Sequence, residues 1–135
     1  IVFGDWSSDV CSSDLLNFIP ARLSLMLIPV AALCCRLNAG NAWRVGRRFR
    51  HAHVSPNSAH SMAAFAGALD TRLGGTATYF GIRKDKPFIG DGTRIDEATL
   101  ITGATGLFSS ATALLALFAA IFHLILHLAT RYACA

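Results

Sequence analysis

The chain has 135 residues, of which 53% are hydrophobic and only 15% are charged, and its mean hydropathy is positive at +0.48. This balance is unusual for a soluble domain of such length, so it favours a membrane protein with at most one domain. The formal net charge is +4, and ten of the twelve Lys and Arg residues lie between Arg36 and Arg94. The four cysteines form no CxxC pair, which argues against a disulfide framework or a zinc site.

The first fifteen residues differ in composition from the rest of the chain. The segment Gly4–Leu15, GDWSSDVCSSDL, holds three of the eight acidic residues and lacks the basic start and apolar core of a signal peptide. Within it, DWSSDVCSSD matches the translation of a common short-read sequencing adapter in one reading frame. We therefore interpret residues 1–15 as a scar of sequence assembly and expect the natural chain to continue upstream of residue 16.

Residues 16–37 are predicted to form a first hydrophobic helix. A run of this length can cross a bilayer core of about 30 Å. However, Pro20 and Arg22 interrupt it, and the charge-free run Leu23–Cys35 is too short to span alone. A charge at the bilayer centre costs about 2.5 kcal/mol or more. The residues alone therefore leave two readings open for Arg22, a position near the membrane interface or one facing a polar cavity.

Residues 38–106 are predicted to form a polar loop with structure of its own. Four arginines follow the first hydrophobic helix closely, and this basic excess places the loop in the cytoplasm. These are Arg44, Arg47, Arg48 and Arg50. They could bind anionic lipid, nucleic acid or a polyphosphate, or act as topology determinants without a ligand. Nucleic acid is disfavoured, because no reading motif or aromatic platform accompanies the charge.

Within this loop, SPNSAHSMAAFAGAL is predicted to be a helix with Ser55 as its N-cap and Pro56 at its first position. Gly74 would close the far end, and the small residues of the helix would permit close packing against a neighbour. The following glycine-punctuated stretch is turn-rich, with a hairpin expected around Asp85. Asp96 would then open the next helix, where the helix dipole stabilises its negative charge.

Residues 107–130 are predicted to be a transmembrane helix, because the segment carries no formal charge and is followed by Arg131 and Tyr132 as interface anchors. The helix that opens at Asp96 would run straight into this span. The fold class expected is all-α. It would be a polytopic helical membrane protein with a structured polar loop between two hydrophobic helices.

Two patterns in the chain have spacings that could bind ions. The pairs His51/His53 and His123/His127 could chelate a metal. The first lacks a third ligand nearby and the second lies near the end of the membrane helix, so a structural role is preferred for both. Glycines in the loop allow backbone amides to approach a ligand closely, and Arg72, Lys86 and Asp91 beside them suit phosphate and a divalent metal. No P-loop is present.

Five motifs occur in order between Leu16 and Thr99, namely LNFIPARL, SPNS, AAFAGALDTRLGG, YFG and KPFIGDG. Together they resemble the CobD/CbiB family of membrane-bound cobalamin-biosynthesis proteins, whose members are adenosylcobinamide-phosphate synthases. The resemblance implies a multi-pass enzyme of the inner cell membrane, of which residues 16–135 would be the C-terminal part. The implied reaction is ATP-dependent amidation of adenosylcobyric acid, a corrinoid, with aminopropanol phosphate, and ATP and Mg²⁺ are the implied cofactors. The incomplete chain is expected to be inactive by itself.

The resemblance also implies functional residues. The catalytic candidates are Arg22, Arg72, Lys86 and Asp91, with the first three as phosphate or carboxylate ligands and Asp91 as the metal ligand. The substrate-binding candidates are Asn17, Ser55, Asn57, Gly74, Gly75, Tyr79, Gly81, Gly90 and Gly92. Asp14 is set aside, because the adapter would also supply it. Where many family members carry a glutamate after SPN, this chain has His60, Ser61 and Met62, so a role for that glutamate is unsupported.

An alternative from a different class is a non-catalytic membrane module whose basic loop binds anionic lipid or a partner protein. Such a loop needs Arg and Lys in any order, whereas SPN, RLGG and IGDG in succession favour the enzyme. The lipid bilayer is an expected partner in both readings, and nucleic acid in neither.

Overall fold

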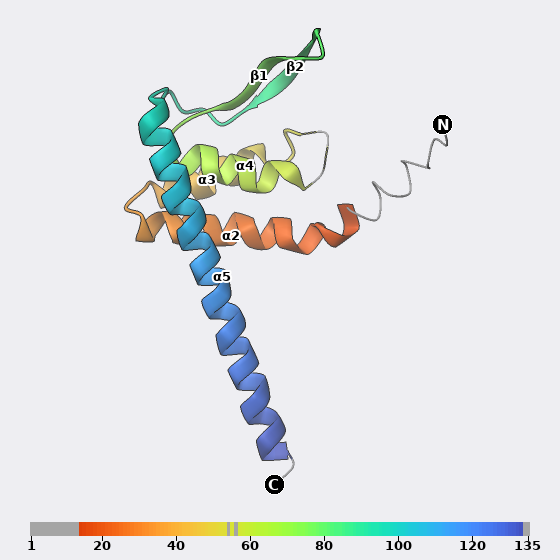
Figure 1. Ribbon diagram of the computed structural model, residues 1–135, viewed down its shortest axis with the longest axis vertical. Coiled ribbons are helices and arrows are strands. Elements are labelled where there is room, and N and C mark those ends of the chain that lie inside the picture. Colours follow the sequence, from red (N-terminus) through yellow and green to blue (C-terminus); the bar gives the residue numbers. More distant parts are fainter. Residues whose placement is uncertain (1–13, 54, 56, 134–135) are drawn as a thin grey trace, which may run out of the picture.

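The computed structural model describes residues 14–53, 55 and 57–133. Its elements in chain order are α2 (Phe18–Cys34), α3 (Ala39–Phe49), α4 (Ser58–Ala68), β1 (Leu73–Tyr79), β2 (Ile82–Ile89) and α5 (Glu97–Ala133). Figure 1 shows α2, α3 and α4 gathered at one end of the long helix α5, whose C-terminal part extends away from them. All but two residues of the predicted assembly scar lie outside the described residues, and that interpretation stays a prediction.

Small residues allow α3 and α4 to pack at very short range. A Cβ atom added at Gly67 of α4 would lie 2.6 Å from the carbonyl oxygen of Asn41 in α3. The same two residues are joined by a hydrogen bond of 2.8 Å from Asn41 Nδ2 to the Gly67 carbonyl. Ala63 and Ala64 beside them are fully buried. The close packing predicted for this helix is therefore confirmed.

Both ends of α4 differ from the prediction. The helix begins at Ser58, after Asn57, and the Ser55 hydroxyl accepts a weak hydrogen bond of 3.5 Å from the Asn57 N–H instead of capping the helix. Pro56 lies outside the described residues. At the far end Asp70 adopts a left-handed conformation with φ of 54°, and the next N–H returns to the Ala66 carbonyl at 3.0 Å. This bond satisfies a terminal carbonyl, so the helix closes before Gly74.

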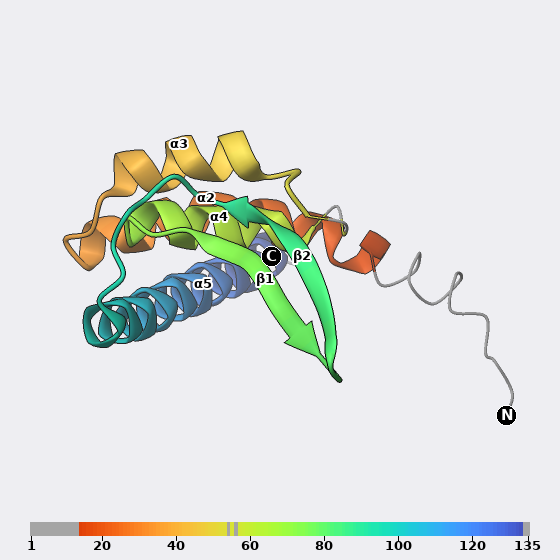
Figure 2. The same cartoon turned by 90° about the horizontal axis from the view of Figure 1, so that it is seen from above.

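A β-hairpin corrects the all-α expectation. Strands β1 and β2 pair antiparallel, with Tyr79 opposite Ile82. The two residues between them, Phe80 and Gly81, both have positive φ, which suits the twist of a two-residue hairpin turn. The hairpin expected around Asp85 is therefore wrong in position, since Asp85 lies within β2 and accepts a hydrogen bond of 2.6 Å from Thr76 of β1. Figures 1 and 2 show the turn projecting away from the helices.

The helix α5 is continuous from the polar loop through the predicted span, as expected. The Asp96 carboxylate accepts a hydrogen bond of 3.3 Å from the Thr99 N–H and a second bond from the Thr99 hydroxyl, so it caps the helix. Ten residues of α5 precede residue 107. Only Leu107 of α5 belongs to the buried core, which it shares with Ile28 and Ala32 of α2.

By length and composition two helices of the described part could cross a membrane, Asp14–Cys34 and Glu97–Tyr132. The most apolar window of the first is 22% buried inside the structure, whereas that of the second is not buried at all. Figure 1 shows the two helices crossing at a steep angle. The described chain is thus mostly helical with two candidate membrane helices, and a polytopic arrangement stays a prediction.

Candidate functional site

Two of the family-like motifs meet at the side chain of Asn57. Its amide oxygen accepts a hydrogen bond of 3.3 Å from Arg22 Nη1. Its amide nitrogen donates to the backbone oxygen of Asp14 at 2.6 Å and to Oδ1 of the same residue at 3.3 Å. Asn57 is 5% exposed. The amide therefore sits between a cation and an anion, which fixes its orientation, because only its oxygen accepts and only its nitrogen donates.

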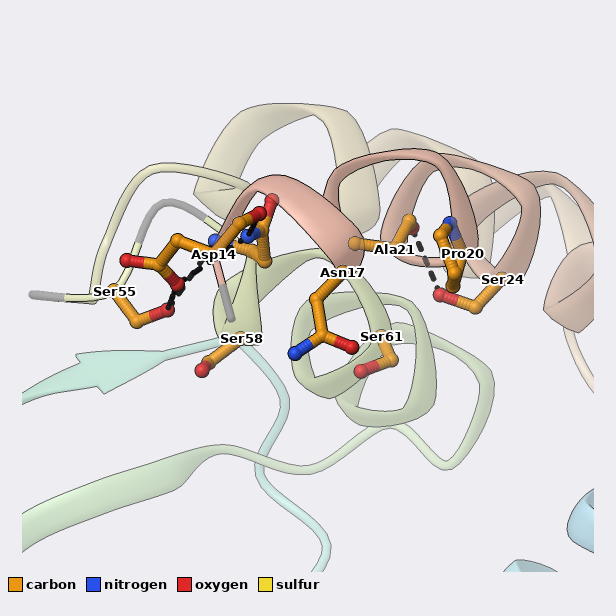
Figure 3. Close-up of a pocket in the computed structure, with 9 residues that line it drawn as sticks. Asp14, Asn17, Pro20, Ala21, Ser24, Ser55, Ser58 and Ser61 are labelled. Atoms are coloured by element: carbon orange, nitrogen blue, oxygen red, sulfur yellow. Dashed lines mark hydrogen bonds between the residues drawn. The ribbon is translucent and has the colours of Figure 1, made fainter. Parts of the chain in front are cut away.

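A polar cavity of about 330 Å³ lies beside Asn57. The Ser55 hydroxyl on its wall donates a hydrogen bond of 3.1 Å to Asp14 Oδ1. Asn17, Ser58 and Ser61 lie around the same space (Figure 3). The lining offers hydroxyl and amide groups that both donate and accept, so it suits a polar ligand. The structure thus brings together Asn17, Ser55 and Asn57 from the predicted set.

Asp14 takes part in this arrangement, although it is not among the site residues predicted from the sequence. Its carboxylate contacts Ser55 and Asn57, which lie more than forty positions further along the chain. An acid three positions before the asparagine of the NxIPAR motif is the available signal. The adapter match removed that signal, because the same residue could be accounted for without any function.

Arg22 faces into the protein, which agrees with the second reading left open for it, a side chain that faces a polar cavity. Its guanidinium donates to the Phe18 carbonyl at 2.8 Å, lies 3.2 Å from the centre of the Phe18 ring, and reaches Asn57. The side chain is half-buried. It also lines a second cavity between α2, α3 and α4. Arg22 therefore links the polar cavity to a separate, more basic one.

The RLGG and IGDG motifs meet at a third cavity of about 390 Å³. Arg72, Gly90, Asp91 and Gly92 from the predicted set line it together with Arg94. The Arg72 guanidinium stacks on the Phe88 ring at 4.8 Å from the ring centre. A Cβ atom at Gly92 would lie 2.1 Å from the backbone of Asp70, so the loop passes closer there than any side chain would permit.

Asp91 is held by two arginines of α3. Its Oδ2 atom lies 3.1 Å from Arg44 Nη1 and 3.4 Å from Arg48 Nη1. Magnesium takes oxygen ligands in an octahedral arrangement, usually with one or two carboxylates. In the described part of the chain no group of three His, Cys, Asp or Glu residues could hold a metal ion, and the one carboxylate here already faces two cations. Asp91 as a magnesium ligand stays a prediction, because a single carboxylate can hold this ion together with water and phosphate oxygens.

The remaining predicted site residues lie on the hairpin, apart from these cavities. Gly74 and Gly75 belong to β1, Lys86 to β2, and Gly81 to the turn between them. A Cβ atom at Gly74 would approach the Pro87 carbonyl oxygen to 2.3 Å, so the strand irregularity there demands glycine whether or not a ligand binds. The side chain of Tyr79 lies outside the described residues.

One buried residue that the sequence reasoning did not assign is His60. Its side chain is 2% exposed, and its Nδ1 atom has no hydrogen-bond partner among the described residues. Burial, and next the positive charge of Arg22, lower the pKa of His60 from its ordinary value, and the backbone of Asn57 offsets this only in part. The His51 ring packs edge-on against it at 5.9 Å. A lone histidine in an alanine-rich helix was the only signal in the sequence.

Comparison with known proteins agrees with the motif pattern. A family model described as CobD/Cbib protein matches residues 9–108. The cobalamin biosynthesis protein CbiB of Salmonella arizonae is 53% identical over 81 residues, which are 60% of this chain and 25% of the relative. The cobalamin biosynthesis protein CobD of Klebsiella pneumoniae is 52% identical over 81 residues, which are again 60% of this chain and 25% of the relative. That of Clostridium perfringens is 48% identical over 89 residues, which are 66% of this chain and 28% of the relative.

The chain spans about a quarter of the length of the curated relatives it matches. No solved structure matches it. The family match covers the NxIPAR and SPN motifs that meet at Asn57 and the RLGG and IGDG motifs that meet at Asp91. On this match the chain belongs to the CobD/Cbib family.

Proposed function

We propose that this chain supplies part of an enzyme of cobalamin biosynthesis that joins adenosylcobyric acid to aminopropanol phosphate in an ATP-dependent amidation. The relatives are named as cobalamin biosynthesis proteins, and the family match covers residues 9–108 of this chain. The observation that carries the proposal is the contact of Arg22 with Asn57, because it joins two motifs that lie 35 residues apart into one site.

The chemistry of amide formation suits such a site. A carboxylate is a poor acyl donor, because its oxygen is a poor leaving group until it carries a phosphoryl substituent. ATP would supply that substituent, after which the amine nitrogen attacks the carbonyl carbon and the substituted oxygen leaves. Negative charge gathers on both partners, so fixed cations and hydrogen-bond donors stabilise the transfer.

Within this reaction the described residues have distinct tasks. The hydrogen bond from Arg22 to Asn57 would hold the Arg22 guanidinium in one orientation toward an anionic group. Arg72 and Arg94, on the wall of the third cavity, would accept a second anionic group. Asp91 would act as the counter-charge that positions Arg44, a different role from the metal ligand predicted from the motif.

We also propose that the enzyme acts at the cell membrane with the loop of residues 38–106 on the cytoplasmic side. Support comes from the bare apolar surface of α5 and from the ten basic residues concentrated between Arg36 and Arg94. Soluble phosphate-bearing substrates would reach the cavities from that side.

A chimaeric enzyme tests the proposal. The matched segment of the Salmonella arizonae relative is replaced by the corresponding residues of this chain, and the product is expressed in cells that lack their own enzyme. Membranes are then assayed for adenosylcobinamide phosphate formed from adenosylcobyric acid, aminopropanol phosphate and ATP. We expect turnover in the chimaera, and a loss of about tenfold or more in an Asn57→Ala version, which removes the bond that links Arg22 to the SPN motif.

An Arg83→Ala chimaera is the matched control, because Arg83 is an exposed hairpin cation whose side chain is 75% accessible. It should keep the activity of the unmodified chimaera. A chimaera that is present in the membrane at the normal level but forms no product would overturn the proposal and favour the non-catalytic membrane module. Full activity in the Asn57→Ala version would refute the site.

A further inference from the structure

The basic residues of α3 divide into two sets that face different surroundings. Arg44 and Arg48, four positions apart, lie on one helix face and pair with Asp91. Arg47 lies on another face, where its guanidinium stands 5.6 Å from the centre of the Trp43 ring. A carboxylate balances the charge of Arg44 and Arg48 only, so Arg47 is the arginine of α3 that is available to an external anion.

Arg47 faces the cavity between α2, α3 and α4, which has a volume of about 480 Å³. Its lining includes Arg22, Arg47, Arg50, His51 and His60. No acidic residue is among the described residues that line it, and none of its three arginines forms an ion pair within the described part of the chain. Several cations that line one cavity produce a positive potential that attracts an anion.

The buried imidazole of His60 gives independent support for a ligand here. It lines the cavity, is almost completely buried, and leaves Nδ1 without a hydrogen-bond partner among the described residues. A buried polar atom without a partner costs free energy, and native proteins rarely leave one unsatisfied. The Nδ1 atom is closed to solvent, so an anion in the cavity would become its partner only after a rotation of the imidazole ring.

We propose that this cavity binds a phosphate monoester group. Its arginines come from α2 and the α3 region, and the His60 imidazole comes from α4, so these side chains approach from different directions. A tetrahedral group with three terminal oxygens can accept from all of them, whereas a planar carboxylate suits a single arginine fork. Trp43 and Met26 complete the lining and would contact an apolar substituent.

The inference rests on the proposed function, because aminopropanol phosphate is itself a phosphate monoester, and it adds the cavity that would hold such a group. Binding by this chain needs no turnover, so it is tested separately from the amidation. The phosphate could come from a soluble metabolite or from the headgroup of an anionic lipid. Met26, whose side chain is 59% exposed, lies on the surface of α2 beside the cavity, so a lipid chain could lie there as well. The experiment therefore distinguishes the two sources.

The test uses the full chain in a neutral maltoside detergent, with Trp6→Phe as the background. Trp6 and Trp43 are the two tryptophans of the sequence, so the variant leaves Trp43 on the cavity wall as the single fluorescent reporter. Glycerol 3-phosphate is titrated at constant ionic strength. In a second arm, the micelles are doped with phosphatidic acid, and phosphatidylcholine serves as the reference lipid. We expect a saturable change in Trp43 fluorescence in at least one arm.

Two substitutions locate the binding. Arg47→Ala removes an exposed cation of the cavity and should weaken binding roughly tenfold. His60→Leu removes the buried imidazole at similar volume and should also weaken it, while circular dichroism verifies the fold. Arg83→Ala removes an equal charge from the hairpin and should leave the affinity unchanged. Because these variants differ in exposure, failure of the buried one to fold would still leave Arg47→Ala as the test.

Each outcome decides the proposal. Binding in both arms, or only to glycerol 3-phosphate, supports a site for soluble phosphate monoesters, and binding only to phosphatidic acid supports a lipid headgroup site. Absence of saturable binding in both arms overturns the inference. Equal weakening by Arg47→Ala and Arg83→Ala, or no weakening by Arg47→Ala, would also overturn it, since the phosphate would then not depend on this cavity.

Discussion

The two apolar helices of this chain, α2 and α5, have similar compositions and very different surroundings. α2 contacts α3, α4 and α5, and its residues Ala31 and Ala32 are fully buried. α5 contacts α2 near Leu107, and beyond Leu114 every described side chain is exposed. Hydropathy does not distinguish the helices, because it measures affinity for any apolar surrounding. The difference teaches that one helix buries its surface within the protein and the other needs an apolar phase outside it.

α2 itself combines both conditions. Ile28 and Ala32 pack into the core, whereas Leu23, Met26 and Val30 lie on the surface with about half or more of their area exposed. Since α2 and α5 cross at a steep angle (Figure 1), both cannot follow the normal of one bilayer in this arrangement. The comparison therefore predicts that α5 is the helix that depends most on the membrane.

The largest effect is expected for a charge placed in the middle of α5. Leu117→Arg should make membrane insertion less favourable by about 2.5–3.5 kcal/mol, because an arginine at a helix centre is costly in hydrocarbon. Leu33→Arg, at an equally exposed position near the end of α2, should cost less. The measurement is the fraction of protein that stays in membranes after an alkaline wash. Equal loss for the two variants would remove the distinction between the helices.

A second prediction applies one substitution to both helices. Ala31→Leu on α2 should destabilise the fold by about 1–3 kcal/mol, because Ala31 has no exposed surface and the added atoms would overpack the core. Ala120→Leu on the exposed surface of α5 should change stability by about 0.5 kcal/mol at most. Thermal unfolding in detergent measures both. Similar midpoints for the two variants would show that α2 is not packed as described.

A smaller effect is expected where the two helices touch. Cys35 Sγ of the segment after α2 lies 3.2 Å from Ser110 Oγ of α5. Ser110→Ala should cost about 0.5–1 kcal/mol, the usual net value of a hydrogen bond. Ser109→Ala, one residue earlier and exposed, should have no effect and serves as the control. The same unfolding assay measures these variants. In a Cys35→Ala background, Ser110→Ala should have no further effect, and an equal loss in both backgrounds would show that the contact is absent.

The smallest effect concerns the first turn of α5, outside the apolar part. The Thr99 hydroxyl, and next the Thr99 backbone, hold the pKa of Asp96 below its usual value of 3.8. Because the folded pKa is lower than the unfolded one, the cap stabilises the turn above the unfolded pKa and is lost as the pH falls through the folded pKa. Protection of the Thr99 amide against hydrogen exchange should fall over this acidic range. In Asp96→Asn it should hardly depend on pH, and an equal pH dependence in both proteins would contradict the cap.

Several parts of the fold could be predicted from local sequence. The charge-free run predicts the helix at 107–130, Asp96 predicts where it opens, and the alanine-rich stretch after Asn57 predicts a closely packed helix. Each of these signals resides in neighbouring residues. The hairpin position could not be found in the same way. A phenylalanine at positive φ is uncommon, so Phe80 gave no turn signal, and the register of two strands is decided only when they pair.

The candidate site divides in a similar manner. By itself the sequence determined which residue types the motifs contain, that the middle of the chain is basic, and that two stretches are apolar, because composition and order are properties of the chain alone. Tertiary structure decided that Asn57 lies between Asp14 and Arg22, and that Asp91 balances Arg44 and Arg48 but not Arg47. These contacts join residues 35 or more positions apart, so they follow from how α2, α3 and α4 cross, and the close approach of their small residues sets that geometry.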